Sequence, residues 1–240
     1  MSLRVLGVIP ARGGSKGIPR KNIAPLGDRP LLAHTLAAVA GSERLTRTVV
    51  STDDAEIAGV AAQWGGDVPF LRPADLAADT SAAIPNIQHA LRMVEEQGDE
   101  PYDAVLMLQP TAPFRGAAHI DAAVELLEAT GADSVISVVD VEAHHPARMK
   151  YLDGDRLVDP PFGEARENQN RQELRPMFLR NGAIYLTRRD ILLDGSFKGN
   201  DCRALVMPAL RSVNIDTPLD LRYAEWLLAE QLVEGPAAPA

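Results

Sequence analysis

Residues 4–22 read RVLGVIPARGGSKGIPRKN, an apolar run that leads directly into a loop of glycines and cations. Short apolar runs of this kind are typical of buried strands. Ligands of α/β proteins bind beyond the carboxyl ends of such strands, where this loop begins. Its glycines let backbone amides approach phosphate oxygens, and its four Lys and Arg side chains supply charge with no acid among them. The stretch predicts a candidate phosphate site, with a turn of solvated charges as the alternative.

The alternation of short apolar runs with longer helical segments continues outward along the chain. Helical spacing of apolar residues predicts helices over 30–43, 54–65, 82–98, 117–131 and 218–234. Strands are predicted over 4–10, 47–52, 67–72, 103–110, 134–141, 181–189, 203–208 and 212–216. This order predicts an α/β fold of the Rossmann-like type, with a mainly parallel sheet flanked by helices.

The alternation breaks between residues 142 and 180, which are rich in proline, arginine, glutamate and asparagine and show no clear period. A segment of this length is too long for a plain connection between two elements. We therefore expect a single domain over 1–234, with 142–180 as an inserted arm for dimerisation or substrate binding. The tail 235–240 reads GPAAPA and is expected to be disordered.

The composition narrows the classes of partner. Among 240 residues, Lys and Arg number 24 and Asp and Glu 33, so a sequence-independent grip on nucleic acid is not expected. No apolar run is long enough to predict a membrane span, and the N-terminal run lacks the order of a secretory signal. The single cysteine, Cys202, excludes an internal disulfide and favours a cytoplasmic protein.

Seven segments, taken in order, resemble one known family. They are IPARGGSKGIPRKNI (9–23), VVSTDDAEIA (49–58), LRPADLAADTS (71–81), MLQPTAPFR (107–115), EAHHPAR (142–148), RNGAIYLT (180–187) and NIDTPLDL (214–221). The chain resembles the CMP-sialic acid synthetases, or acylneuraminate cytidylyltransferases, over nearly its whole length. The resemblance implies that the anomeric hydroxyl of a nine-carbon 2-keto sugar acid attacks the α-phosphate of CTP and releases pyrophosphate. It also implies a magnesium ion and a homodimer whose arm reaches the neighbouring site.

The resemblance assigns nucleotide contacts residue by residue. Arg72 matches the arginine that reads the base, and Ala83 stands where the family often has serine, so one contact to the base is missing. Four residues are implied in catalysis: Arg12, Lys16, Lys21 and Asp216. Nucleotide binding is implied for Arg12, Gly13, Ser15, Lys16, Asn22, Arg72, Thr80 and Ser81.

The resemblance also implies which residues contact the sugar acid. The resemblance assigns the sugar acid to Gln109, Thr111, Arg148, Arg171 and Arg180, and a guanidinium fork suits a carboxylate.

The expected metal ligands come from the segment 212–216. Asn214 and Asp216 lie two apart on this predicted strand and so share a face. Thr217, Pro218 and Asp220 form a helix start of the capping-box type, which leaves Asp216 free to bind magnesium. The family commonly has aspartate where this chain has Asn214, so metal binding is expected to be weaker.

Other interpretations stay open at this stage. The enzyme could use GTP or another sugar, or the chain could be a nucleotide-binding homologue without turnover. Two aspartates, Asp53 and Asp54, precede a predicted helix, and capping is the expected role for both. Neither a Walker loop nor a G-x-G-x-x-G fingerprint is present.

Overall fold

A computed structural model describes residues 2–78, 81–163, 166 and 168–234. Thr80 and the tail 235–240, for which sequence predictions were made, lie outside the described residues. The strands are β1 Val5–Pro10, β2 Pro25–Leu26, β3 Arg29–Pro30, β4 Arg47–Ser51, β5 Ala104–Met107, β6 Ser134–Asp140, β7 Tyr151–Asp153, β8 Arg156–Val158, β9 Phe178–Arg188 and β10 Cys202–Val206. The α-helices are α1 Leu31–Ala40, α2 Ala55–Gln63, α3 Ala83–Glu96, α4 Ala117–Thr130, α5 Arg189–Leu193 and α6 Pro218–Ala229. The 3-10 helices are η1 Lys21–Ile23, η2 Ala74–Leu76, η3 Glu142–His144, η4 Pro146–Arg148, η5 Arg171–Glu173 and η6 Ala209–Arg211.

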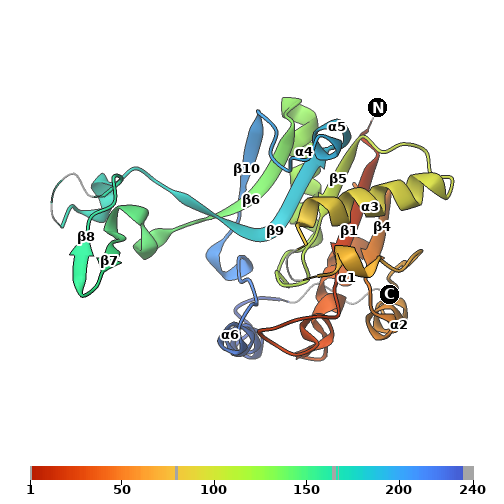
Figure 1. Cartoon of the computed structure of the whole chain (residues 1–240), viewed down its shortest axis with the longest axis horizontal. Helices are drawn as coiled ribbons and strands as arrows, with labels where there is room; N and C mark the ends of the chain where they lie inside the picture. The colour runs from red at the N-terminus through yellow and green to blue at the C-terminus, as the bar shows by residue number, and fades with distance from the viewer. Residues whose placement is uncertain (1, 79–80, 164–165, 167, 235–240) are drawn as a thin grey trace.

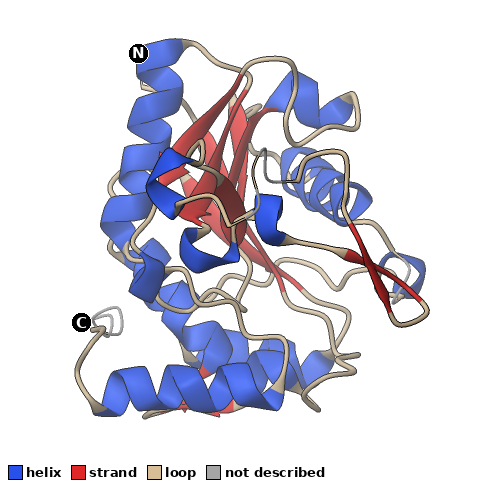
Figure 2. Ribbon diagram, turned by 90° about the vertical axis from the view of Figure 1, so that its left-hand side faces the viewer, coloured by secondary structure: helices blue, strands red, loops and turns tan. Residues whose placement is uncertain are grey.

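A six-stranded sheet in the order β10-β6-β9-β5-β1-β4 forms the centre of the molecule. β1 pairs in parallel with β4 and β5, and β6 pairs in parallel with β10. β9 lies antiparallel between β5 and β6. Helices cover both faces of the sheet (Figures 1 and 2). The expectation of a mainly parallel α/β sheet flanked by helices is confirmed.

The core forms on both faces because side chains of a strand alternate between them. Val5 and Ile9 of β1 pack with α1, α2 and α4, whereas Leu6 and Val8 pack with α3 and α5. A strand buried on both sides reads as a continuous apolar run, which explains why β1 is apolar at every position before Pro10. A third cluster joins α6 to Ile18, Phe114 and Ile215 beneath the loops that follow the strands.

Two segments predicted as strands are not strands in the structure. Residues 67–72 make only two isolated bridges to the β4 side, Val49 with Asp67 and Thr52 with Leu71. Pro69 lies between these bridges and has no N–H to donate, which interrupts the ladder. Residues 212–216 contain no strand, since the Ile215 N–H donates to the Thr111 carbonyl in a loop.

The chain between β6 and β9 leaves the body of the molecule as an arm, which ends in the β7–β8 hairpin (Figure 1). Every residue of β7 and β8 is exposed. In the part of the chain that the structure describes, no helix has the length and apolar character needed to cross a bilayer.

Candidate active site

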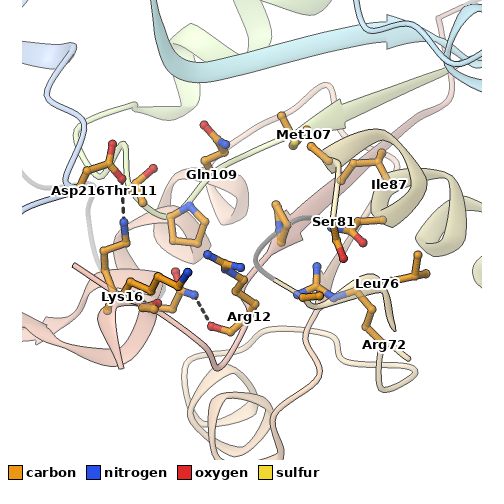
Figure 3. A pocket seen from close by; sticks show the side chains of 18 of the residues that line it. Arg12, Lys16, Arg72, Leu76, Ser81, Ile87, Met107, Gln109, Thr111 and Asp216 are labelled. Carbon is orange, nitrogen blue, oxygen red and sulfur yellow. Dashed lines mark hydrogen bonds and ion pairs between the residues drawn. The ribbon is translucent and has the colours of Figure 1, made fainter. Parts of the chain in front are cut away.

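A cavity of about 480 Å³ lies at the carboxyl ends of β1 and β5, where Pro10 and Met107 form part of its wall (Figure 3). Residues from four separate stretches of sequence meet here. The predicted site residues that line it are Arg12, Ser15, Lys16, Lys21, Asn22, Arg72, Ser81, Gln109, Thr111, Asn214 and Asp216. The cavity therefore brings together the loop 11–22 that is expected to bind phosphate (the phosphate loop), the arginine expected to read the base, the strand-end glutamine and the expected metal ligands.

Three hydrogen bonds fix the start of the phosphate loop. The Ala11 N–H donates to the Ser51 carbonyl at 2.9 Å, and the Gly13 N–H donates to Asp53 Oδ1 at 3.1 Å. Asn22 donates from Nδ2 to the Arg12 carbonyl at 2.9 Å, so this side chain closes the loop on itself. The Arg12 guanidinium extends into the centre of the cavity (Figure 3). Gly13 was predicted to bind nucleotide, but its amide faces Asp53.

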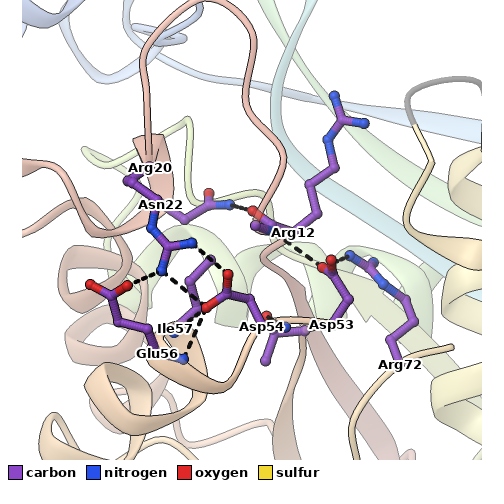
Figure 4. A network of polar contacts seen from close by, with 10 residues as sticks. Arg12, Arg20, Asn22, Asp53, Asp54, Glu56, Ile57 and Arg72 are labelled. Atoms are coloured by element: carbon purple, nitrogen blue, oxygen red, sulfur yellow. Dashed lines mark hydrogen bonds and ion pairs between the residues drawn. The ribbon is translucent and has the colours of Figure 1, made fainter. Parts of the chain in front are cut away.

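Arg72 and Asp53 link the loop to the opposite wall (Figure 4). Arg72 Nη2 lies 3.4 Å from Asp53 Oδ1, the same oxygen that accepts the Gly13 N–H. The Arg72 side chain is only 2% exposed, and burial lowers its pKa while Asp53 acts in the opposite direction. Asp53 is therefore a link between two parts of the site, a role that sequence reasoning missed.

The second aspartate, Asp54, is the helix cap that the sequence predicts. Its Oδ1 accepts the backbone N–H groups of Glu56 and Ile57 at 2.9 and 3.0 Å at the start of α2. Its carboxylate also accepts hydrogen bonds from Arg20, whose guanidinium pairs with Glu56 as well (Figure 4). The hydrogen bonds from Arg20 lower the pKa of Asp54 to about 2. Arg20 thus anchors the loop to α2.

Asp216 sits where the loop meets the start of α6. Lys21 Nζ donates to Asp216 Oδ1 at 2.8 Å, and Asn214 Nδ2 donates to Asp216 Oδ2 at 2.6 Å. A Cβ added to Gly17 would lie 2.3 Å from the Asp216 carbonyl oxygen, so the backbone can approach this closely only with glycine. The predicted capping box is present between Thr217 and Asp220.

Arg115 holds the strand-end residue Gln109 in place, and sequence reasoning assigned it no role. The Arg115 side chain is buried, with Nη1 donating to the Ala183 carbonyl at 2.7 Å and Nη2 to Thr35 Oγ1 at 2.7 Å. Both nitrogens also lie 3.3 Å from the Gln109 carbonyl. Gln109 Oε1 is 3.0 Å from where a Cβ of Gly182 would stand, and Gly182 has φ +78. Arg115 therefore ties the segment after β5 to β9 and α1.

The arm arginines are placed apart from this cavity. Arg148 Nη2 donates to the Gln169 carbonyl at 3.2 Å within the arm. Arg171 lines a separate hollow of about 260 Å³ at the root of the arm, with Asp140, Glu142 and His145. Arg180 is exposed on β9, opposite Val138. Their predicted contacts with the sugar acid stay predictions.

Comparisons with known proteins agree on one kind of activity. The family model described as cytidylyltransferase matches residues 6–196. The chain is 40% identical to the CMP-N,N'-diacetyllegionaminic acid synthase of Legionella pneumophila over 97% of both chains. It is 32% identical to the N-acylneuraminate cytidylyltransferase of Escherichia coli, over 93% of this chain and 52% of that protein.

A solved structure shares the fold. The structure of CMP:2-keto-3-deoxy-manno-octonic acid synthetase complexed with CTP superimposes with a TM-score of 0.71, covering 95% of this chain and 99% of that one. The two sequences are 18% identical, so this similarity bears on the fold alone.

Proposed function

The chain belongs to the cytidylyltransferase family, and we propose that it joins CMP from CTP to the anomeric hydroxyl of a nonulosonic acid, a nine-carbon 2-keto sugar acid. The observation that carries this proposal is the cavity itself. It gathers Arg12, Lys16 and Lys21 from the glycine loop opposite the buried Arg72. Three cations opposite a buried guanidinium suit a nucleoside triphosphate.

The cavity performs this chemistry mainly by positioning and by charge. The anomeric hydroxyl gives up its proton to water and its oxygen bonds to the α-phosphorus, while the bond to the bridging oxygen breaks and pyrophosphate leaves with the electron pair. Negative charge grows on the leaving group, so Arg12 and Lys16 stabilise the transition state more than the ground state. Gln109 lies on the β5 side of the cavity, where it would orient the sugar acid.

We propose magnesium as the metal. No cluster of three or more His, Cys, Asp or Glu occurs in the described ranges, so protein ligands alone do not form a closed site there. Magnesium commonly binds through one or two carboxylates together with substrate phosphates and water. Asp216 and the Asn214 amide oxygen, both in the cavity wall, belong to that donor set, although Asp216 is not free: an ion bound there would compete with its hydrogen bonds from Lys21 and Asn214. When bound, the ion would neutralise phosphate charge.

The sugar acid carries a carboxylate. None of the three arm arginines that were expected to bind it lines the cavity of the same chain. We propose that Arg148, Arg171 and Arg180 act in the cavity of a second copy, in a homodimer. The β7–β8 hairpin supports this proposal, because a two-stranded hairpin is marginally stable alone and here exposes Leu152 and Leu157 by more than 70%.

N,N'-Diacetyllegionaminic acid is the first sugar to test, given the relative from Legionella pneumophila. We also place the protein in the cytoplasm, because a single cysteine, Cys202, suits a reducing compartment.

A pyrophosphate-release assay tests the proposal. CTP, UTP, GTP and ATP are each combined with N,N'-diacetyllegionaminic, pseudaminic and N-acetylneuraminic acids, with and without magnesium. Release is expected with CTP and at least one of these acids, and only with magnesium. Release with GTP alone would replace CTP by GTP in the proposal, and no release with any pair would overturn it.

Two variants locate the reaction in the cavity. Lys16→Ala removes a phosphate-binding charge, and Asp216→Ala removes the carboxylate expected to hold magnesium. Each is expected to lower kcat/KM at least 100-fold while circular dichroism stays unchanged, because both act where charge develops. Near-normal rates in both variants would place the reaction elsewhere.

A further inference from the structure

Asn86 is a buried polar residue in the wall of the cavity. It lies on α3 and is 9% exposed. Its Oδ1 is buried and accepts no hydrogen bond from the described residues. A buried oxygen without a donor is destabilising, so a ligand that supplies a donor there gains affinity.

The helix places Asn86 on the cavity side for a simple geometric reason. Residues three and four apart share a helix face, and the α3 residues that line the cavity are Ala83, Asn86 and Ile87. Ala83 and Ile87 have no hydrogen-bonding side chain. Asn86 therefore supplies the polar side chain that α3 contributes to the cavity.

The surroundings of Asn86 suit a planar base. The wall of the same cavity includes the apolar side chains of Leu76, Ala78, Ala83, Ile87 and Met107. Apolar side chains that can pack against the ring, together with a few polar groups, are the usual setting for a heterocycle. The Ser81 hydroxyl, also in this wall, already donates to the Asp75 carbonyl at 2.8 Å.

Cytosine presents one edge with two kinds of group. Its ring carbonyl and ring nitrogen accept hydrogen bonds, and its exocyclic amine donates them. Arg72 can only donate, so it matches the acceptors. The amine needs an acceptor, which Asn86 Oδ1 offers.

We propose that Asn86 recognises the exocyclic amine of the cytosine base and so contributes to the choice of CTP over UTP. This inference rests on the proposed use of CTP. Uracil has a carbonyl in place of the amine, which would meet the Asn86 oxygen. An amide can rotate to present its NH₂ group instead, so asparagine discriminates less strongly than a carboxylate would.

Binding of CTP and UTP to the full chain, measured by titration calorimetry without sugar acid, tests the inference separately from turnover. Asn86→Leu removes the acceptor and is expected to weaken CTP binding about tenfold and UTP binding less than threefold. Asn86→Asp keeps acceptors only and is expected to raise the preference for CTP over UTP. Gln88→Leu, on the same helix but bonded to the Leu192 carbonyl, is the matched control and is expected to leave the preference unchanged.

Opposite shifts of the CTP:UTP preference in the two Asn86 variants support the inference. A preference that stays within twofold of wild type in both variants overturns it. If circular dichroism shows that Asn86→Leu does not fold, the Asn86→Asp variant alone tests the inference. An unchanged CTP:UTP preference in that variant would then contradict it. If wild type binds CTP but releases no pyrophosphate with any sugar acid, the proposed reaction fails while this test of base recognition still stands.

Discussion

At the scale of the residue, Gly17 shows how closely the phosphate loop is fitted to the rest of the site. Its missing side chain lets the loop pass the Asp216 carbonyl, beside the Lys21–Asp216 ion pair. Gly14, three residues earlier in the same loop, has open space where a Cβ would stand. The two glycines therefore allow a matched comparison.

Gly17→Ala is expected to lower kcat/KM at least tenfold, because the new methyl group would force the loop away from Asp216. Gly14→Ala is expected to stay within about threefold of wild type. Steady-state kinetics with CTP as the varied substrate provide the comparison. Equal losses in both variants would show that the close approach at Gly17 does not matter for the reaction.

The sequence allowed some of these residues to be predicted and not others, for a physical reason. Arg12 and Lys16 are recognisable because a glycine-rich basic loop after a strand is a local pattern. Asp53 and Asp54 look alike in sequence, since either can cap a helix. Only the folded chain shows that Asp54 faces the backbone of α2, whereas Asp53 faces Arg72.

At the scale of the element, the start of α2 is joined to the phosphate loop through Arg20 and Asp54. The carboxyl group of Asp54 has a folded pKa of about 2, below its ordinary 3.8. A lowered pKa means that the folded state favours the carboxylate. This contribution to stability is therefore fully present above about pH 4 and is lost as the pH falls through 2.

Asp54→Asn is expected to flatten the dependence of the free energy of unfolding on pH between 4 and 2. Urea unfolding across that range measures the effect. Asp194→Asn, which changes an exposed aspartate after α5, serves as control and should keep the wild-type profile. A profile for Asp54→Asn that matches wild type would exclude the Arg20–Asp54 pair as a source of acid sensitivity.

Strands and helices of the core could be predicted because their periodicity is local. The form of residues 67–72 and 212–216 could not be predicted from periodicity. These segments run beside the sheet or beyond its strand ends without joining the ladder of the sheet. The second segment still holds Asn214 and Asp216 together, through a direct hydrogen bond and not through a shared strand face. The sequence predicted that Asn214 and Asp216 lie close together, but it did not predict the hydrogen bond that holds them.

At the scale of the whole molecule, the arm is the segment proposed to contact a second copy of the chain. Leu152 and Leu157 are paired across the β7–β8 hairpin and are 73% and 72% exposed. Burial against a second copy would stabilise the dimer by about 2 kcal/mol for each leucine.

The double variant Leu152→Asp, Leu157→Asp is expected to turn a wild-type dimer into a monomer and to lower the rate with sugar acid. Sedimentation velocity measures the oligomeric state. Asp155→Asn, at the turn of the same hairpin, should leave it unchanged. A wild-type monomer, or a double variant that remains dimeric, would contradict the role given to the arm.

The fate of the α-phosphorus of CTP tests the central proposal most directly. The enzyme is supplied with CTP labelled at the α- or the γ-phosphorus, together with N,N'-diacetyllegionaminic acid and magnesium. The α-label is expected in the sugar product and the γ-label in pyrophosphate, with both transfers lost in Lys16→Ala. Transfer of the γ-label to the sugar, or CTP left intact with every nonulosonic acid tested, would contradict the proposed reaction.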